Sequence, residues 1–195
     1  MFIWISKASL LALIFWLAAC QMTPGLLIDQ DRARTLAVLD GAVNVAAPPG
    51  YCVDQKLSRQ QLDGAVVLIG RCTSTSAQPP VVISVTIGAA ASAGAIADGG
   101  ATLAAFFETP AGRAALSQSG RAETVTIVQS GASGGVFALR IFETGVGDYW
   151  RAVFGLSGRL VTLSVQAPMD QSLDPAAGQR LLNATIAALR KANAV

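Results

Sequence analysis

The sequence predicts an α+β fold, in which an antiparallel sheet of about six to eight strands is built from hairpins and covered by helices, as in an α/β/α sandwich. Short apolar runs rich in β-branched residues are separated by turn residues along most of the chain. The predicted order is a hairpin, two strands, a helical segment, four strands in two hairpins and a terminal helix. Strands joined by short turns pair in antiparallel fashion, which is why an antiparallel sheet is expected.

The first 20 residues predict an export signal. Lys7 precedes an apolar run that ends in Leu17-Ala18-Ala19-Cys20. The run is shorter than the roughly 20 apolar residues that a transmembrane helix needs, whereas a secretory signal requires only a short apolar core. The alternative is a retained membrane anchor, which would require burial of Ser6, Lys7 and Ser9.

The four residues that end at Cys20 resemble a lipobox, the recognition sequence of bacterial lipoproteins. The resemblance implies that Cys20 is acylated, with palmitate or a similar fatty acid, and that the chain is cut after Ala19. Residues 1–19 would then be a cleaved signal peptide, 20–30 a lipid-anchored tether and 31–195 a single periplasmic globular domain. Gln21, in place of Asp, resembles the sorting signal of outer-membrane lipoproteins.

Length and charge narrow the possible partners. Removing 19 residues from 195 leaves 176, which suits one domain with its own core. Without Lys7, 13 basic side chains stand against 12 acidic ones, and the two signs are mixed along the chain. Because no basic run indicates a nucleic-acid surface, the expected partners are the membrane, through the lipid, and an envelope protein.

The three cysteines divide into one anchor and one predicted disulfide. Once Cys20 is assigned to lipid, Cys52 and Cys72 are the natural pair in an oxidising periplasm. Such a bridge would close a loop of about 20 residues and stabilise the fold by roughly 3 kcal/mol. A thiolate metal site is the alternative, but two cysteines in a chain without histidine offer too few soft ligands.

The N-terminal part of the domain predicts a hairpin. Its arms are residues 34–39 and 42–46, and Asp40-Gly41 between them suits the positive φ angles of a two-residue type I′ turn. Pro48-Pro49-Gly50 ends the second arm, because proline has no amide proton for a ladder. The chain then turns through Tyr51-Cys52.

Two core strands and a helical segment follow. The apolar runs 65–69 and 81–87 predict buried strands, with Cys72 near the end of the first. The Ala/Gly-rich stretch 88–100 reads as a loop. A helical stretch starts at Thr102, and a second extends from Thr109-Pro110 to about Ser119, because threonine is a good N-cap and proline is tolerated in the first turn.

The C-terminal half predicts two hairpins and a helix. The first hairpin pairs 123–128 with 136–142 around a turn at 131–135, and the second pairs 149–154 with 159–165 around Ser157-Gly158. Asp174 caps the final helix, whose apolar positions recur on one side of the helix. Those positions are Leu181, Leu182, Thr185, Ile186 and Leu189.

The second of these hairpins carries a further resemblance. Its stretch Gly158-Arg-Leu-Val-Thr-Leu-Ser-Val-Gln-Ala-Pro168, followed by a helix, resembles the end of PsbP-like domains over about 20 residues. The resemblance implies an α/β/α sandwich that serves as an accessory or binding module. It assigns no ligand residue in this chain.

The residues that most enzymes require are largely missing. Without histidine, the chain has no Ser-His or Cys-His pair and no imidazole metal ligand. Neither a phosphate-binding Gly-x-x-x-x-Gly-Lys-Ser/Thr motif nor a strand-linked dinucleotide motif occurs. We therefore predict no catalytic residue, no metal and no cofactor.

One cluster of polar and aromatic residues remains as a candidate. Glu143 and Asp148 flank the turn 144–147, where paired acids could serve hydrolysis or bind a cation. The alternative is a polar hairpin turn. The candidate binding surface comprises Arg140, Glu143, Asp148, Tyr149, Trp150 and Arg151.

Three functional hypotheses follow from these observations. The first is a lipid-anchored, non-catalytic binding or assembly module of the cell envelope, facing the periplasm at the outer membrane. The second is a periplasmic hydrolase or lyase that uses Glu143 and Asp148. The third is a purely structural envelope lipoprotein.

Overall fold

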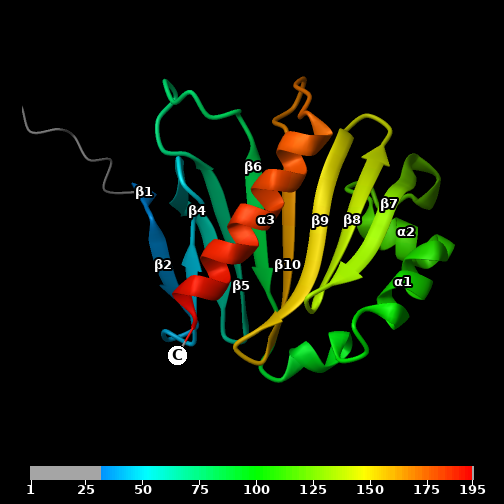
Figure 1. The fold of residues 1–195 in the computed structure, drawn as a ribbon, viewed down its shortest axis with the longest axis horizontal. Coiled ribbons are helices and arrows are strands. Elements are labelled where there is room, and N and C mark those ends of the chain that lie inside the picture. The colour runs from blue at the N-terminus through cyan, green and yellow to red at the C-terminus, as the bar shows by residue number, and fades with distance from the viewer. Residues whose placement is uncertain (1–31, 195) are drawn as a thin grey trace, which may run out of the picture. The chain divides into compact units, whose positions relative to one another are not determined.

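The computed structural model describes residues 32–194, which form an α+β fold around an antiparallel sheet (Figure 1). The sheet has eight strands in the order β1-β4-β5-β6-β10-β9-β8-β7. Neighbouring strands all pair in antiparallel fashion. The predicted fold class is thereby confirmed.

The strands of the large sheet differ in length, from two residues to eleven. They are β1 (Arg32–Ala33), β4 (Tyr51–Gln61), β5 (Gly64–Arg71), β6 (Val82–Ile87), β7 (Val125–Ser133), β8 (Val136–Glu143), β9 (Gly147–Leu156) and β10 (Arg159–Gln166). The last four form the two hairpins that the sequence predicts. In the second hairpin, Ser157 and Gly158 both take positive φ angles at the turn.

The predicted N-terminal hairpin forms a small sheet of its own. Its strands are β2 (Thr35–Val38) and β3 (Val43–Ala46). Asp40 and Gly41 take positive φ angles, as predicted, and the Ala42 amide donates to the Leu39 carbonyl at 3.0 Å. Leu39 also has a positive φ, so the loop is longer than the two residues expected.

The helices begin at the residues that the sequence indicated. Thr109 caps α2 (Pro110–Leu116) by accepting from the Gly112 amide, and Asp174 caps α3 (Pro175–Ala192) by accepting from the Ala177 amide. Two further helices precede α2 in the chain. They are η1 (Ser92–Ile96), which lies in the stretch predicted as a loop, and α1 (Ala101–Glu108). The helix α2 ends three residues earlier than expected, because Ser117 already has an extended conformation.

The sheet carries packed elements on both faces. Alternation along β9 divides the core, since Trp150, Ala152 and Phe154 face one side while Tyr149 and Val153 face the other. The first side packs against α3 and the β2–β3 hairpin, and α3 crosses that face in Figure 1. The second side packs against α1, α2 and η1 around β7, β8 and β9. The result is the expected α/β/α arrangement.

The predicted disulfide between Cys52 and Cys72 is present, with a Cα–Cα distance of 4.8 Å. It joins the start of β4 to the residue after β5. Strand β4 itself was not predicted, because most of its residues from Asp54 to Gln61 are polar. It forms through backbone pairing with β5, with a register shift between Asp54 and Arg59.

The helix α3 is held at both ends, by the large sheet near its start and by the β2–β3 hairpin near its end. Near its start, the Trp150 indole N–H donates to the Pro175 carbonyl at 2.8 Å. Near its end, Asn193 accepts from the Asn44 amide at 2.9 Å and donates to the Asn44 carbonyl at 2.7 Å. Within residues 32–194, no helix has both the length and the apolar character needed to span a bilayer.

Candidate functional site

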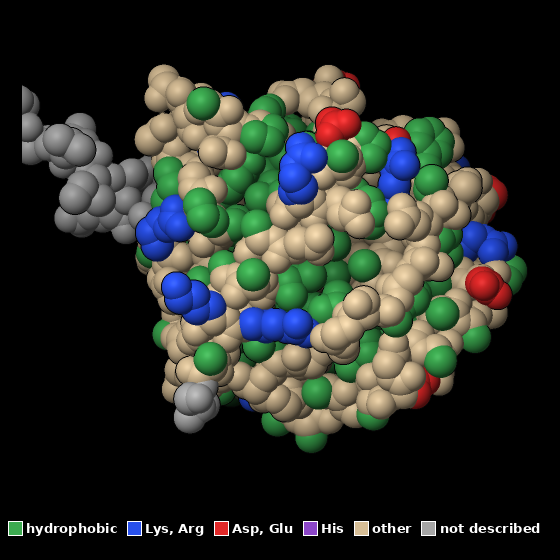
Figure 2. Space-filling model, in the orientation of Figure 1, with side chains coloured by type: hydrophobic (Ala, Val, Ile, Leu, Met, Phe, Trp, Pro, Cys, Tyr) green, Lys and Arg blue, Asp and Glu red, His purple; other side chains and the backbone are tan. Residues whose placement is uncertain are grey.

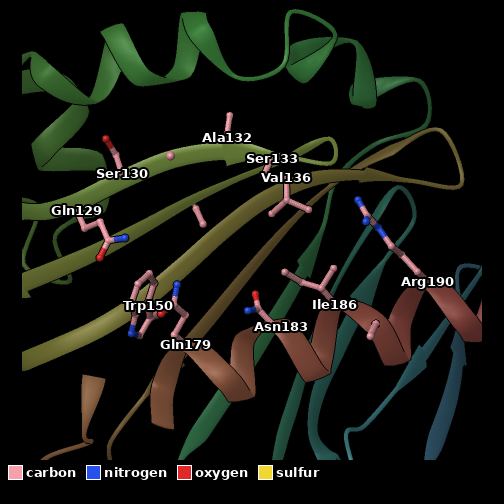
Figure 3. A pocket seen from close by; sticks show the side chains of 13 residues that line it. Gln129, Ser130, Ala132, Ser133, Val136, Trp150, Gln179, Asn183, Ile186 and Arg190 are labelled. Carbon is pink, nitrogen blue, oxygen red and sulfur yellow. The ribbon is translucent and has the colours of Figure 1, made fainter. Parts of the chain in front are cut away.

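A groove of about 590 Å³ lies between α3 and the last two strands of the sheet (Figure 3). We call it the α3–β7 groove. Residues of β7, β8, β9 and α3 line it: Gln129, Ser130, Gly131, Ala132, Ser133, Val136, Ala138, Trp150, Gln179, Asn183, Ile186, Ala187 and Arg190. Figure 2 shows the same face, on which Lys and Arg side chains are spread while Asp and Glu side chains lie near the upper and right margins.

Small residues produce the depth of this groove. On its floor, Ala138 stands directly opposite Gly131 in the β7–β8 register, so the sheet surface is low at this level. At the start of α3, by contrast, Gly178 lies against Trp150, and a Cβ at Gly178 would be 2.7 Å from Trp150 Cδ1. The helix therefore contacts β9 closely and leaves the space over β8 and β7 open.

The polar groups of the groove come from α3 and from one side of β7. Gln179, Asn183 and Arg190 project from the helix, and Gln129 is directed to the same side of the sheet (Figure 3). Ser130 also borders the groove, but its side chain is directed to the opposite side of β7. The lining thus combines an apolar floor with amide and hydroxyl donors and acceptors along its rim.

Arg190 provides the positive charge of the groove. Its guanidinium donates to the Gly134 carbonyl at 2.8 Å and lies 5.9 Å from the centroid of the Phe154 ring. These contacts join the last turns of α3 to the β7–β8 turn and to β9. No carboxylate is among the lining residues, so the lining has a net positive charge.

The six residues of the predicted binding surface do not form one surface. Because side chains alternate along β8 and β9, Arg140, Asp148 and Trp150 face α3. Arg140 and Asp148 form an ion pair of 3.0 Å whose side chains are 27% and 33% exposed. Trp150 lines the groove, but its side chain is 5% exposed. The other three residues lie on the opposite face.

Glu143 is deeply buried on the opposite face, with 1% exposed, as is Tyr149. Its carboxylate accepts from Ser117 Oγ at 2.6 Å and from the Gln118 amide at 2.9 Å. Glu143 and Asp148 therefore do not meet, and the geometry forms no pair of acids at the 144–147 turn. The carboxylate instead binds the residues that follow α2.

Tyr149 completes this buried cluster. Its hydroxyl donates a hydrogen bond to the Leu116 carbonyl at 2.8 Å and lies 3.4 Å from Glu143 Oε2. Burial raises the pKa of Tyr149 to about 12; the nearby Arg151 lowers it, and Glu143 raises it. The Arg151 guanidinium lies 5.6 Å from the Tyr149 ring and donates to Ser164 Oγ at 3.0 Å.

The groove residues on β7 and α3 were missed by sequence reasoning. The stretch from Gln129 to Ser133 lacks β-branched residues, and we expected a turn there rather than the second half of a strand. On α3, a signal was present, because positions 179, 183, 186, 187 and 190 recur on one side of a helix. Cys20 lies outside the described residues.

Within residues 32–194, no group of three or more His, Cys, Asp or Glu side chains is placed to hold a metal ion. Comparisons with family models, curated proteins and solved structures give no significant match, so no catalytic family is identified for this chain.

Proposed function

We propose that this chain is a lipid-anchored envelope protein that acts as a non-catalytic binding module and that the α3–β7 groove is its binding site. The volume and the lining of the groove are the observations that support this proposal. Its volume of about 590 Å³ is in the range of roughly 300–1,000 Å³ typical of ligand sites. Its apolar floor favours burial of an apolar group, while Gln129, Gln179 and Asn183 can orient a ligand through hydrogen bonds.

The chemistry of the lining supports binding rather than catalysis. General acid–base catalysis requires a group that gains and loses a proton near neutral pH. Among the residues that line the groove, Arg190 is the charged one, and a guanidinium stays protonated in proteins. The tyrosine with the strongly raised pKa, Tyr149, is buried on the other face of the sheet.

The proposed location rests on the sequence and on the disulfide. The residues from Leu17 to Cys20 support lipid anchoring, and Gln21 supports sorting to the outer membrane. The Cys52–Cys72 bridge is compatible with an oxidising compartment such as the periplasm. A tether of about ten residues would let the groove meet other envelope components while the lipid stays in the membrane.

Photocross-linking in the native host tests the groove directly. We would place a benzophenone side chain at Gln179, which is exposed in the groove, and at Ala176, which is exposed on α3 outside it. Adducts are expected from position 179 and not from position 176. Combining the cross-linker with Ala187→Trp, which fills the groove with an indole, should reduce the adducts at least fivefold.

The outcomes separate the proposal from its alternatives. Equal adducts from positions 179 and 176 would show that contacts over α3 do not depend on the groove. Adducts from position 179 that persist at full yield with Ala187→Trp would place the contact outside the groove. Either result would overturn the assignment of the binding site.

A further inference from the structure

The strand β7 presents an unusual edge to its surroundings. It is the last strand of the eight-stranded sheet, and it has no strand neighbour on its outer side among residues 32–194. A register shift between Ile127 and Gln129 divides it into two parts. The first part lies near α2, whereas every residue from Val128 to Ser133 is exposed.

The usual protection of a sheet edge is missing from this second part. Edge strands are commonly protected by charged residues, proline or covering segments, because unpaired N–H and C=O groups bind other strands. The opposite edge follows this rule, since β4 is paired with β1 over two residues and carries Lys56 and Arg59 farther along. Residues 128–133 contain neither a charge nor a proline.

The bare edge and the α3–β7 groove share residues. Gln129 to Ser133 form one wall of the groove, and Gly131 lies in the middle of that wall. Because Gly131 is directly opposite Ala138, no side chain blocks the path from the edge to the floor. An added strand would lie two strand spacings, about 10 Å, from β8. A long side chain from it would lie over Gly131 and extend toward Ala138.

We propose that the exposed part of β7, residues 128–133, binds an extended segment of a partner protein as an added strand. Alternate side chains of that segment enter the α3–β7 groove across Gly131. This proposal rests on the proposed function and names its partner class. The segment carries long apolar residues at alternate positions, because the floor of the groove is apolar. It lacks basic residues, because the positive charge of Arg190 in the lining would repel them.

Two other occupants fit the groove less well. A second copy of the chain pairing through β7 would offer only Gln129, Gly131 and Ser133, or their neighbours, which cannot fill the apolar floor. A glycan would need an exposed aromatic face for stacking, but Trp150 is 5% exposed and its indole N–H is bound to Pro175. A glycan, moreover, does not require the peptide groups of a bare strand edge.

Peptide selection against the detergent-solubilised full chain provides the test. The probe is a phage-displayed library of random dodecapeptides, and the enriched peptides are then synthesised for titration. Gly131→Val should weaken their binding at least tenfold, because an isopropyl group closes the path to the floor. A Cβ at Gly131 would meet no atom within 4 Å, and valine favours a strand, so the fold should tolerate this change.

The matched control is Ser130→Val on the same strand. Ser130 is directed away from the groove, so binding should stay within twofold of the wild type (Figure 3). Methylation of successive peptide nitrogens supplies a second readout. Binding should be lost at every other position, because only alternate N–H groups of an added strand point toward β7.

The failures of the two proposals can be told apart. Absence of an enriched peptide, equal effects of the two valine variants, or a methylation profile without alternation would overturn strand addition. Dimers of the chain that form through β7 and exclude the peptides would overturn it as well. If cross-links from position 179 remain sensitive to Ala187→Trp after such a result, the groove still binds a ligand of another class.

Discussion

The hydroxyl of Ser117 donates a 2.6 Å hydrogen bond to the carboxylate of Glu143. This contact joins the residue after α2 to the last residue of β8, although the two lie 26 positions apart in the chain. Burial of a carboxylate is costly unless hydrogen bonds compensate for lost water. Ser117 and the Gln118 amide provide that compensation and hold α2 against the sheet.

We expect Glu143→Ala to lower the free energy of unfolding by about 1–3 kcal/mol. The substitution removes the carboxylate that accepts from the half-buried Ser117 hydroxyl and from the Gln118 amide, and with it the link between the end of α2 and β8. Urea denaturation followed by circular dichroism measures the change. The exposed Glu123→Ala is the control and should stay within about 0.5 kcal/mol of the wild type. Equal stability of both variants would contradict a structural role for Glu143.

Gly178→Ala should destabilise the protein by about 1–3 kcal/mol, although alanine favours helices. The new Cβ would lie 2.7 Å from Trp150 Cδ1 and 3.1 Å from Leu173 Cδ2, so α3 must move away from β9. The midpoint of thermal unfolding reports the loss. Gly131→Ala, whose Cβ meets no atom within 4 Å, should leave the midpoint unchanged or raise it. A rise of the midpoint in Gly178→Ala would show that the protein accommodates a Cβ next to Trp150 without loss of stability.

Removal of the disulfide should reduce stability by roughly 3 kcal/mol, because the bridge restricts a loop of about 20 residues in the unfolded chain. The double variant Cys52→Ala/Cys72→Ala and the reduced wild type should unfold at similar urea concentrations. Adding reductant to the double variant should change nothing further. If the urea midpoint of the wild type stayed unchanged after complete reduction of the disulfide, this expectation would be contradicted.

Stability should fall as the pH rises from about 10 to about 12. The pKa of Tyr149 is raised to about 12 from its usual 10.0, mainly by burial, so the folded protein retains a proton that the unfolded chain loses. The stabilisation is complete below pH 10 and disappears as the pH passes the folded-state pKa. Tyr51 contributes in the same direction, because burial also raises its pKa.

Ultraviolet titration of the two tyrosines, together with urea denaturation at each pH, measures this effect. Tyr149→Phe should flatten the fall in stability between pH 10 and 12, even though it also removes the hydrogen bond to Leu116. A titration in which both tyrosines of the folded protein ionise at the usual pKa would contradict the prediction.

Cys20→Ser should abolish lipid labelling in the native host and cause the unprocessed precursor to accumulate. The reason is chemical, since a serine hydroxyl cannot replace the thiol as the site of acylation. Metabolic labelling with a fatty acid and membrane fractionation measure the outcome, with the Cys52→Ala/Cys72→Ala variant as the cysteine control. Normal processing and a protein released from membranes would refute the anchor.

Local sequence signals located the helix starts and most of the strands. Asp174 and Pro175 mark the first turn of α3 because a capping carboxylate and a residue without an amide proton suit the start of any helix. The hairpin of β9 and β10 follows from its Ser157-Gly158 turn. Strand β4 escaped prediction because its polar residues carry no alternation and its pairing with β5 is a long-range property.

The sequence by itself determined the fold class and the pairing of Cys52 with Cys72. Apolar periodicity, turn residues and the positions of cysteines can all be read within short windows, and the proposed lipid anchor likewise rests on the four residues that end at Cys20. Only the tertiary structure decided that Glu143 and Asp148 face opposite sides and that Gly131, Ala138 and α3 enclose a groove. The reason is that a groove depends on strand register and on the distance of a helix from the sheet. Both are set by contacts between residues far apart in the chain.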